Sequence, residues 1–291
     1  MKSKIEEVIE QYSVLTETVV KEKTSEILEN KVNSNKRKEV YTTIFSCIDL
    51  TSLSTSDTEE GIAQFTEKVN KFGEEHPQFP NVAAICVYPS MVKTVRDTLT
   101  EGVGIAAVTA GFPHSQTFIE VKIAETSLAV HDGASEIDIV FPIGKLLEKR
   151  YDEIVDEINE IKEACHGSIL KVILESGALD VRDLQIAAIL AMESGADFIK
   201  TSTGKQQPAA TPEAAWCMCK MIAEYYKITG RKVGFKAAGG ISTADDAIKY
   251  YSIVKELLGE EWLNNGLFRF GASKLANNIL SEIVGDSIKY F

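Results

Sequence analysis

The stretch Gly195-Ala-Asp-Phe-Ile-Lys-Thr-Ser-Thr-Gly-Lys205 determines how the rest of the chain is interpreted. Residues 196–199 form a short, largely apolar run typical of a buried strand, and Lys200 stands where that strand should end. The same layout returns in Lys232-Val-Gly-Phe-Lys-Ala-Ala-Gly-Gly240, with Lys236 in the equivalent place. Burying an unpaired ammonium costs several kcal/mol, so a single lysine there would most simply emerge into solvent. Two lysines that end neighbouring strands indicate amine chemistry instead.

Short β-rich runs alternate with longer helical patterns from residue 40 onward. The spacing leaves room for one helix and two loops between successive strands, as right-handed crossover connections require. Eight such units predict a closed (β/α)8 TIM barrel of the α/β class. An open doubly wound sheet is the alternative, but no glycine-rich dinucleotide fingerprint follows the first strand. The expected strands are Thr43–Asp49, Val82–Val87, Gly104–Ala110, Glu136–Val140, Ile169–Glu175, Ala196–Lys200, Lys232–Lys236 and Leu267–Phe270.

The length of the chain allows the barrel and a small addition to it. The 291 residues are 44% hydrophobic and 25% charged, which is typical of a globular protein. A closed barrel needs roughly 250 residues. We therefore expect an N-terminal helical extension and linker at residues 1–39, and the barrel with a short C-terminal tail at residues 40–291.

The charge distribution limits the classes of partner. The net charge is −12, and no basic stripe with interleaved aromatic residues is present, so a nucleic-acid partner is not expected. Residues 1–23 are heavily charged and lack the apolar core of a signal peptide. No apolar run approaches the roughly 20 residues that span a membrane. We expect a cytoplasmic protein without a membrane partner.

The cysteines and histidines do not indicate a disulfide framework or a metal site. The cysteines are odd in number and scattered, which fits a reducing compartment. The histidines are far apart and lack metal-ligand spacing, so neither a metal nor another cofactor is expected. The residues concerned are Cys47, Cys86, Cys165, Cys217, Cys219, His76, His114, His131 and His166.

Charged side chains gather near the ends of the predicted strands, where a TIM barrel carries its active site. Asp138 shares one strand face with Glu136, and Lys171 lies on the next strand. Lys200 and Lys236 end strands about 4.8 Å apart, so mutual repulsion and desolvation should lower one pKa. A lysine that is neutral at pH 7 can attack a carbonyl and form a Schiff base. A purely structural ion pair is the alternative for Asp138 and Lys171.

Small residues follow the last two predicted strands and indicate a phosphate site. Gly239-Gly240 and Phe270-Gly-Ala-Ser-Lys274 each precede a helix start, where backbone N–H groups can face an anion. Gly204 and Lys205 could complete the cradle with Ser273 and Lys274.

These residues lie in segments that resemble the deoxyribose-phosphate aldolase family of class I aldolases. The similarity runs from about residue 44 to residue 276, and the two lysine segments are specific in combination. The matching segments are CIDLTSL, VAAICVYP, EIDIVF, LKVILESG, GADFIKTSTGK, ATPEAA, VGFKAAGG and FRFGAS.

The resemblance implies reversible cleavage of 2-deoxy-D-ribose 5-phosphate to D-glyceraldehyde 3-phosphate and acetaldehyde, in deoxyribonucleoside catabolism. It implies that Lys200 forms the Schiff base, that Lys236 lowers its pKa, and that Asp138 relays protons with water while paired with Lys171. It also implies a homodimer. The residues expected to bind substrate are Asp49, Thr51, Cys86, Thr201, Gly204, Lys205, Gly239, Gly240, Ser273 and Lys274.

The chain departs from the family pattern at three places. Ala237 replaces the proline of the usual GFKPAGG segment, and Lys274 stands where serine or threonine is common. Many bacterial members end in a tyrosine that helps proton transfer, whereas here Tyr290 is followed by Phe291. Two other functions remain open: another phosphate-binding barrel enzyme, such as a different Schiff-base aldolase or an isomerase, and a non-catalytic sugar-phosphate binder.

Overall fold

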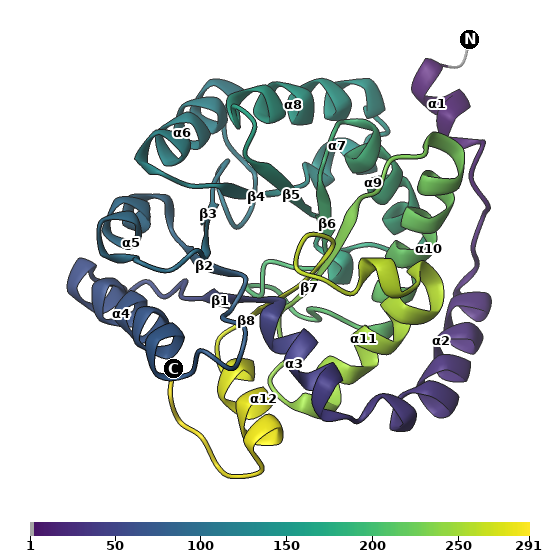
Figure 1. The fold of residues 1–291 in the computed structure, drawn as a ribbon. Helices are drawn as coiled ribbons and strands as arrows, with labels where there is room; N and C mark the ends of the chain where they lie inside the picture. The colour runs from purple at the N-terminus through teal and green to yellow at the C-terminus, as the bar shows by residue number, and fades with distance from the viewer. Residues whose placement is uncertain (1–2) are drawn as a thin grey trace.

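The computed structural model describes residues 3–291 and contains a closed barrel of eight parallel strands in sequential order (Figure 1). Each strand pairs with the next along the chain, and β8 returns to β1. The predicted TIM barrel is therefore confirmed, and the doubly wound sheet is excluded. The strands are β1 Ile48–Thr51, β2 Ala84–Val87, β3 Gly104–Val108, β4 Glu136–Val140, β5 Ile169–Ile173, β6 Phe198–Lys200, β7 Gly234–Ala238 and β8 Phe268–Ala272.

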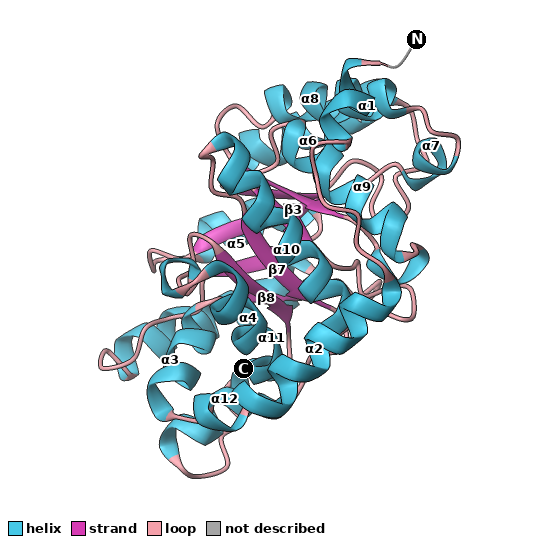
Figure 2. Ribbon diagram, turned by 90° about the vertical axis from the view of Figure 1, so that its right-hand side faces the viewer, coloured by secondary structure: helices cyan, strands magenta, loops and turns pink. Residues whose placement is uncertain are grey.

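Helices surround the barrel and connect the strands (Figure 2). Several begin at an N-cap hydroxyl that accepts a hydrogen bond from the third helical N–H, as Thr211 does from Ala214 at 3.1 Å. The helices are α1 Lys4–Ile9, α2 Glu17–Lys31, α3 Lys38–Ser46, α4 Glu59–Glu75, α5 Val92–Thr98, α6 Ile119–Asp132, α7 Ile143–Leu147, α8 Tyr151–Ala164, α9 Val181–Glu193, α10 Pro212–Thr229, α11 Ala244–Leu258 and α12 Leu275–Val284, with 3-10 turns η1 Asn33–Asn35, η2 Pro89–Met91, η3 Ser176–Ala178 and η4 Glu260–Trp262.

The strands bury apolar side chains on their outer side and charged side chains on their inner side. In β5, Leu170 and Val172 belong to the apolar layer between sheet and helices. Lys171 lies between them in sequence, and its ammonium contacts carboxylates of other strands. This period-2 alternation places the charged residues inside the barrel. A second, small apolar cluster of Ala84, Cys86, Ala106 and Val108 belongs to β2 and β3.

The start of the first strand differs from the sequence prediction. Residues 43–46, expected in a strand, form the end of helix α3, and β1 begins only at Ile48. The β-branched and aromatic residues of this segment favour a strand locally. However, Val40, Tyr41, Ile44 and Phe45 lie on one helical face and are buried. Tertiary packing of this face, which includes contact with α12, decides in favour of the helix.

The N-terminal extension is helical, as predicted, and packs along the outside of the barrel. Helix α2 contacts α10 and α11, and both figures show it beside α11 (Figures 1 and 2). Val20 of α2 is buried there, and Asn35 donates a hydrogen bond to Ser252 at 2.9 Å. Residues 31–39 are not an extended linker, because they contain η1 and the first residues of α3. The division at residue 39 therefore falls inside a helix.

The last residues fold back onto the barrel. Tyr290 packs its ring on Phe72 of α4 with 5.4 Å between centroids, and its hydroxyl lies 3.0 Å from Oε2 of Glu75. The backbone N–H groups of Tyr290 and Phe291 both donate to the side chain of Asn277. Within residues 3–291, no helix combines the length and the apolar character that crossing a membrane requires.

Candidate active site

Adjacent strands bring the predicted catalytic residues into register. Lys200 of β6 and Lys236 of β7 are direct Cα partners, as are Asp138 of β4 and Lys171 of β5. All four side chains are buried: the exposed fraction is 3% for Lys200 and 0% for the other three. The strand ends therefore unite the four residues in one cluster inside the barrel.

Asp138 is the common partner of the three lysines. Its Oδ1 atom accepts a hydrogen bond from Lys171 at 2.9 Å, and its Oδ2 atom accepts from Lys200 at 2.7 Å and from Lys236 at 2.8 Å. Burial alone would raise the pKa of Asp138, but the three ammonium groups outweigh it and hold that pKa well below its usual value. Asp138 is thus a carboxylate shared among three cations.

A second set of charges lies against this cluster. Asp49 accepts hydrogen bonds from Lys236 and from Arg269, the latter at 2.6 Å. Glu136 accepts from Arg269 at 2.9 Å and lies 2.5 Å from the ammonium of Lys171. Burial would raise the pKa of Asp49, but Lys236, Lys171 and Arg269 together lower it. These contacts join β1, β4, β5, β7 and β8 across the barrel.

The cluster contains one more cation than carboxylates. The carboxylates are Asp49, Glu136 and Asp138, and the cations are Lys171, Lys200, Lys236 and Arg269. Lys171, Lys236 and Arg269 each contact at least two of these carboxylates, whereas Lys200 contacts only Asp138 among them. Because a buried excess charge is unfavourable, Lys200, which has the fewest carboxylate partners, is the cation whose protonated form the cluster supports least.

The pKa shifts of the two rim lysines run in opposite directions. Burial lowers the pKa of Lys200, Asp138 raises it, and Lys236 lowers it further, so that the net shift is downward. Burial also lowers the pKa of Lys236, but Asp138 and Asp49 outweigh it, and the net shift is upward. The arrangement keeps a charged Lys236 beside Lys200, whose proton is held less tightly than usual.

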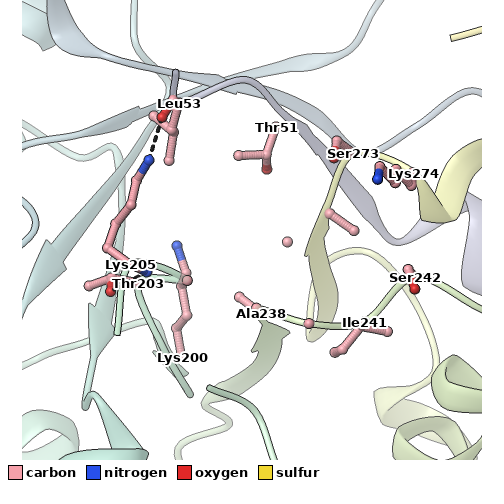
Figure 3. Close-up of a pocket in the computed structure, with 15 residues that line it drawn as sticks. Thr51, Leu53, Lys200, Thr203, Lys205, Ala238, Ile241, Ser242, Ser273 and Lys274 are labelled. Carbon is pink, nitrogen blue, oxygen red and sulfur yellow. Dashed lines mark hydrogen bonds between the residues drawn. The ribbon is translucent and has the colours of Figure 1, made fainter. Parts of the chain in front are cut away.

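Lys200 faces a pocket of about 390 Å³ at the carboxyl ends of the strands (Figure 3). Its side chain points into a space that is bordered on the far side by Ser273 and Lys274. The predicted residues that line the pocket are Thr51, Lys200, Gly204, Lys205, Gly239, Gly240, Ser273 and Lys274.

The turns after β6 and β7 touch each other at the pocket floor. A Cβ atom built on Gly239 would lie 3.2 Å from the Cα of Gly204 and 2.7 Å from the Cβ of Ala209. Both glycines have positive φ, of 77° for Gly204 and 90° for Gly239, which favours glycine. Lys205 extends across the mouth, where its ammonium donates to the carbonyl of Leu53 at 2.5 Å (Figure 3).

Three residues expected to bind substrate are not among those that line the pocket. Asp49 is fully buried among Lys236 and Arg269, and Cys86 is fully buried on β2. The hydroxyl of Thr201 accepts from the N–H of Ala238 at 3.0 Å and lies 3.1 Å from its carbonyl oxygen, so it connects the ends of β6 and β7. Asp49 and Thr201 are held by these scaffold contacts, and Cys86 packs in the small apolar cluster of β2 and β3.

Several residues of the site are not among the predicted ones. Arg269 gave a weak signal, as a cation between the buried aromatics Phe268 and Phe270 of one strand. Glu175, at the end of the predicted fifth strand, accepts hydrogen bonds from the turn after β6. The pocket residues without a clear sequence signal are Leu53, Thr203, Ala238, Ile241 and Ser242, whereas Gly271 and Ala272 belong to the small-residue stretch after the last predicted strand.

The departures from the family pattern have clear places in the structure. Ala237 of β7 is fully buried outside the pocket, and Lys274 lines the pocket beside Ser273. Tyr290 lies at the carboxyl end of α4 and is absent from the pocket lining.

Comparison with known proteins gives a consistent result. Residues 43–269 match the model of the DeoC/LacD family aldolases. The chain is 40% identical to the deoxyribose-phosphate aldolase of Homo sapiens over 248 residues, which cover 81% of this chain and 78% of the human protein. It is likewise 40% identical to the Bos taurus deoxyribose-phosphate aldolase, with coverage of 82% and 79%.

A solved structure agrees in fold. The tetrameric deoxyribose phosphate aldolase from Aeropyrum pernix superposes with a TM-score of 0.66 at 24% identity, over 88% of this chain and 96% of that chain. The family match over most of the barrel and the 40% identities together assign the chain. It belongs to the DeoC/LacD family of aldolases, and is a carbon–carbon lyase of class I.

Proposed function

We propose that the protein reversibly cleaves 2-deoxy-D-ribose 5-phosphate to D-glyceraldehyde 3-phosphate and acetaldehyde, with Lys200 as the Schiff-base residue. The observation that carries the proposal is the position of Lys200, at the top of a buried charge cluster and open to the pocket. Its lowered pKa favours the free amine that carbonyl attack requires.

The bond changes follow from that amine. Neutral Lys200 adds to C1 of the open-chain aldehyde, and the carbinolamine loses water to give a protonated imine. A base then removes the proton of the C3 hydroxyl, the C2–C3 bond breaks, and its electron pair moves toward the iminium nitrogen. Glyceraldehyde 3-phosphate leaves. The remaining enamine is protonated at C2, and hydrolysis releases acetaldehyde and free Lys200.

Asp138 is the proposed proton relay, working through a water molecule. Its Oδ2 atom lies 2.7 Å from the Nζ atom of Lys200 and 2.8 Å from that of Lys236, so both amines are within direct reach. Positioned proton transfer of this kind contributes about 10²–10⁴-fold to rate. Lys171 holds the other oxygen of Asp138 and thereby fixes the orientation of the carboxylate.

The turns that border the pocket after β6, β7 and β8 form the proposed phosphate subsite. Gly204, Gly239 and Gly240 supply backbone groups, and Lys205 and Lys274 supply positive charge. Backbone N–H groups at such turns and at helix starts suit an anion. Phosphate binding would orient the carbonyl toward Lys200, so that remote binding energy serves the chemical step. The cytoplasmic location, the role in deoxyribonucleoside catabolism and the homodimer are predictions that accompany this proposal.

Borohydride trapping tests the proposal. Reduction in the presence of 2-deoxyribose 5-phosphate or acetaldehyde should leave an adduct on Lys200, located by mass spectrometry of the digested protein. Lys200→Ala should lose both adduct and turnover, whereas the matched control Lys249→Ala, on the outer helix α11, should keep both. An adduct and full turnover in Lys200→Ala would refute the assignment.

The same experiment separates the alternative functions. A sugar-phosphate isomerase would convert its substrate by a carboxylate base and would give no trapped imine. A non-catalytic binder would bind the sugar phosphate without forming product.

A further inference from the structure

The end of β5 has an irregular backbone beside the pocket. The N–H of Leu174 donates to the carbonyl of Lys200 at 2.8 Å, and the N–H of Ser176 donates to that of Thr201, also at 2.8 Å. Between these two hydrogen bonds the segment after β5 advances by two residues and the segment after β6 by only one. This is the spacing of a β-bulge in which Glu175 is the extra residue. Glu175 has a φ of 51°, in the left-handed region that favours glycine.

The bulge aims a buried carboxylate at the turn after β6. Glu175 is 4% exposed, and none of the ion pairs among residues 3–291 includes it. Its Oε1 atom accepts from the N–H of Thr203 at 3.2 Å, and its Oε2 atom accepts from the hydroxyl of Thr203 at 2.5 Å. The same hydroxyl oxygen accepts from the N–H of Lys205 at 3.0 Å.

These contacts form a chain that ends in the pocket. Glu175 fixes Thr203, and Thr203 fixes the backbone of Lys205, with Gly204 between them. All of Thr203, Gly204 and Lys205 line the pocket, and Gly204 lies against the glycine turn after β7. The orientation of the backbone in this turn therefore depends on the carboxylate of Glu175.

The left-handed backbone of Glu175 and the burial of its carboxylate are both unfavourable, which indicates that the side chain does more than fill space. A non-glycine residue in the left-handed region is strained and is retained where the surroundings require it, often at functional sites. Both carboxylate oxygens of Glu175 accept hydrogen bonds from a single turn that borders the pocket. Charge-assisted hydrogen bonds of this type are stronger than neutral ones and fix geometry well.

We propose that Glu175 is a positioning residue that holds the Thr203–Lys205 turn in the conformation that binds the phosphate of the substrate. The inference rests on the proposed function only in that the substrate carries a phosphate. Glu175 acts through Thr203 and takes no part in the bond changes at Lys200.

Inorganic phosphate is the probe that tests this role without turnover. Its dissociation constant, measured by isothermal titration calorimetry, should rise roughly tenfold in Thr203→Val and in Glu175→Gln, because each loses a hydrogen bond to a charged group. The double variant should be no weaker than Thr203→Val alone, since the two side chains act in series. Thr203→Ser keeps the hydroxyl and should bind phosphate as the wild type does.

Two further measurements separate positioning from general damage. Trapping of acetaldehyde on Lys200 needs no phosphate and should be unchanged in both single variants. KM for 2-deoxyribose 5-phosphate should rise with the phosphate dissociation constant, whereas kcat/KM for unphosphorylated 2-deoxyribose should stay constant. Glu157→Gln, which alters another buried carboxylate that pairs with Lys122 and does not line the pocket, serves as the control for folding.

Each outcome of these measurements either supports the positioning role of Glu175 or overturns it. An unchanged phosphate affinity in Glu175→Gln and Thr203→Val overturns the proposal. Parallel loss of phosphate binding and acetaldehyde trapping, with a lower unfolding midpoint, also overturns it in favour of a purely structural role. If the wild type traps no aldehyde but phosphate affinity still depends on Glu175, the proposed aldolase reaction fails while the positioning role stands.

Discussion

The Nζ atom of Lys200 lies 2.7 Å from Oδ2 of Asp138, and this is the only ion pair that Lys200 makes within residues 3–291. The carboxylate pulls the pKa of Lys200 upward, against burial and against Lys236. The three influences leave the pKa lowered, with Asp138 close enough to exchange a proton. This contact limits the downward shift of the pKa, and in the proposed mechanism it is the route by which the proton leaves Lys200.

Replacing Lys236 should move the pH dependence of the reaction. Lys236→Leu removes a positive neighbour, so the pKa of Lys200 should rise, and the amine should remain protonated to higher pH. The acidic limb of the kcat/KM profile is expected to shift upward by about one pH unit, with lower activity at pH 7. Acetaldehyde trapping at alkaline pH should persist. An acidic limb identical to that of the wild type would contradict the role of Lys236.

The buried carboxylates should make stability sensitive to acid. The pKa values of Asp49 and Asp138 are lowered in the folded protein, so their contribution is complete above the unfolded value of about 3.9 and is lost as pH falls toward the folded values. Urea midpoints should change little between pH 6 and pH 5 and fall steeply from about pH 4 to pH 2. Asp138→Asn should lower the midpoint at pH 6 and flatten the decline, whereas the exposed Asp152→Asn should leave the curve unchanged.

Lys274 should contribute to phosphate affinity but not to chemistry. It lines the pocket beside Ser273 and is exposed, so its attraction for a dianion is screened. Lys274→Ala is expected to raise KM for the phosphorylated sugar by about two- to fivefold with kcat unchanged. The effect should shrink at high salt, and Lys289→Ala, on the exposed tail, should show none. A loss of kcat at unchanged KM would place Lys274 in the chemical step.

Tyr290 should be dispensable for turnover. Its hydroxyl contacts Glu75, and burial, followed by this hydrogen bond and the charge of Glu75, raises its pKa to about 12. Tyr290→Phe is expected to keep kcat within about twofold of the wild type, because the residue lies outside the pocket. Exchange of the methyl protons of acetaldehyde for deuterium, measured in deuterated water, gives a second measure of the protonation step. A large loss of exchange would mean that the tail reaches Lys200 during the reaction.

The rim of the barrel was predictable because parallel strands all deliver their carboxyl ends to one edge. The pairing of Lys200 with Lys236 follows from strand order alone, since both lysines close adjacent strands. The assignment of Asp138 to the inner face follows from the period-2 alternation within β4.

The interior network was harder to predict because it depends on contacts across the barrel. Arg269 reaches Asp49 on the adjacent strand and Glu136 on a distant one, and the stagger that permits this is not visible in any single segment. Glu175 was placed at a strand end, but the bulge that turns it toward Thr203 depends on a left-handed backbone in a non-glycine residue. Residues 43–46 form a helix and not the predicted strand, because burial of a helical face outweighs local β propensity.

The docking of α2 also bears on assembly. The helix occupies the outer surface of α10 and α11, and Lys31 forms an ion pair with Glu256 of α11 at 3.1 Å. That sector of the outer ring is thereby occupied by the chain's own N-terminal arm. A second subunit could pack directly on the covered part of α10 and α11 only if the arm were displaced, and removing the arm would expose the apolar surface against which Val20 packs.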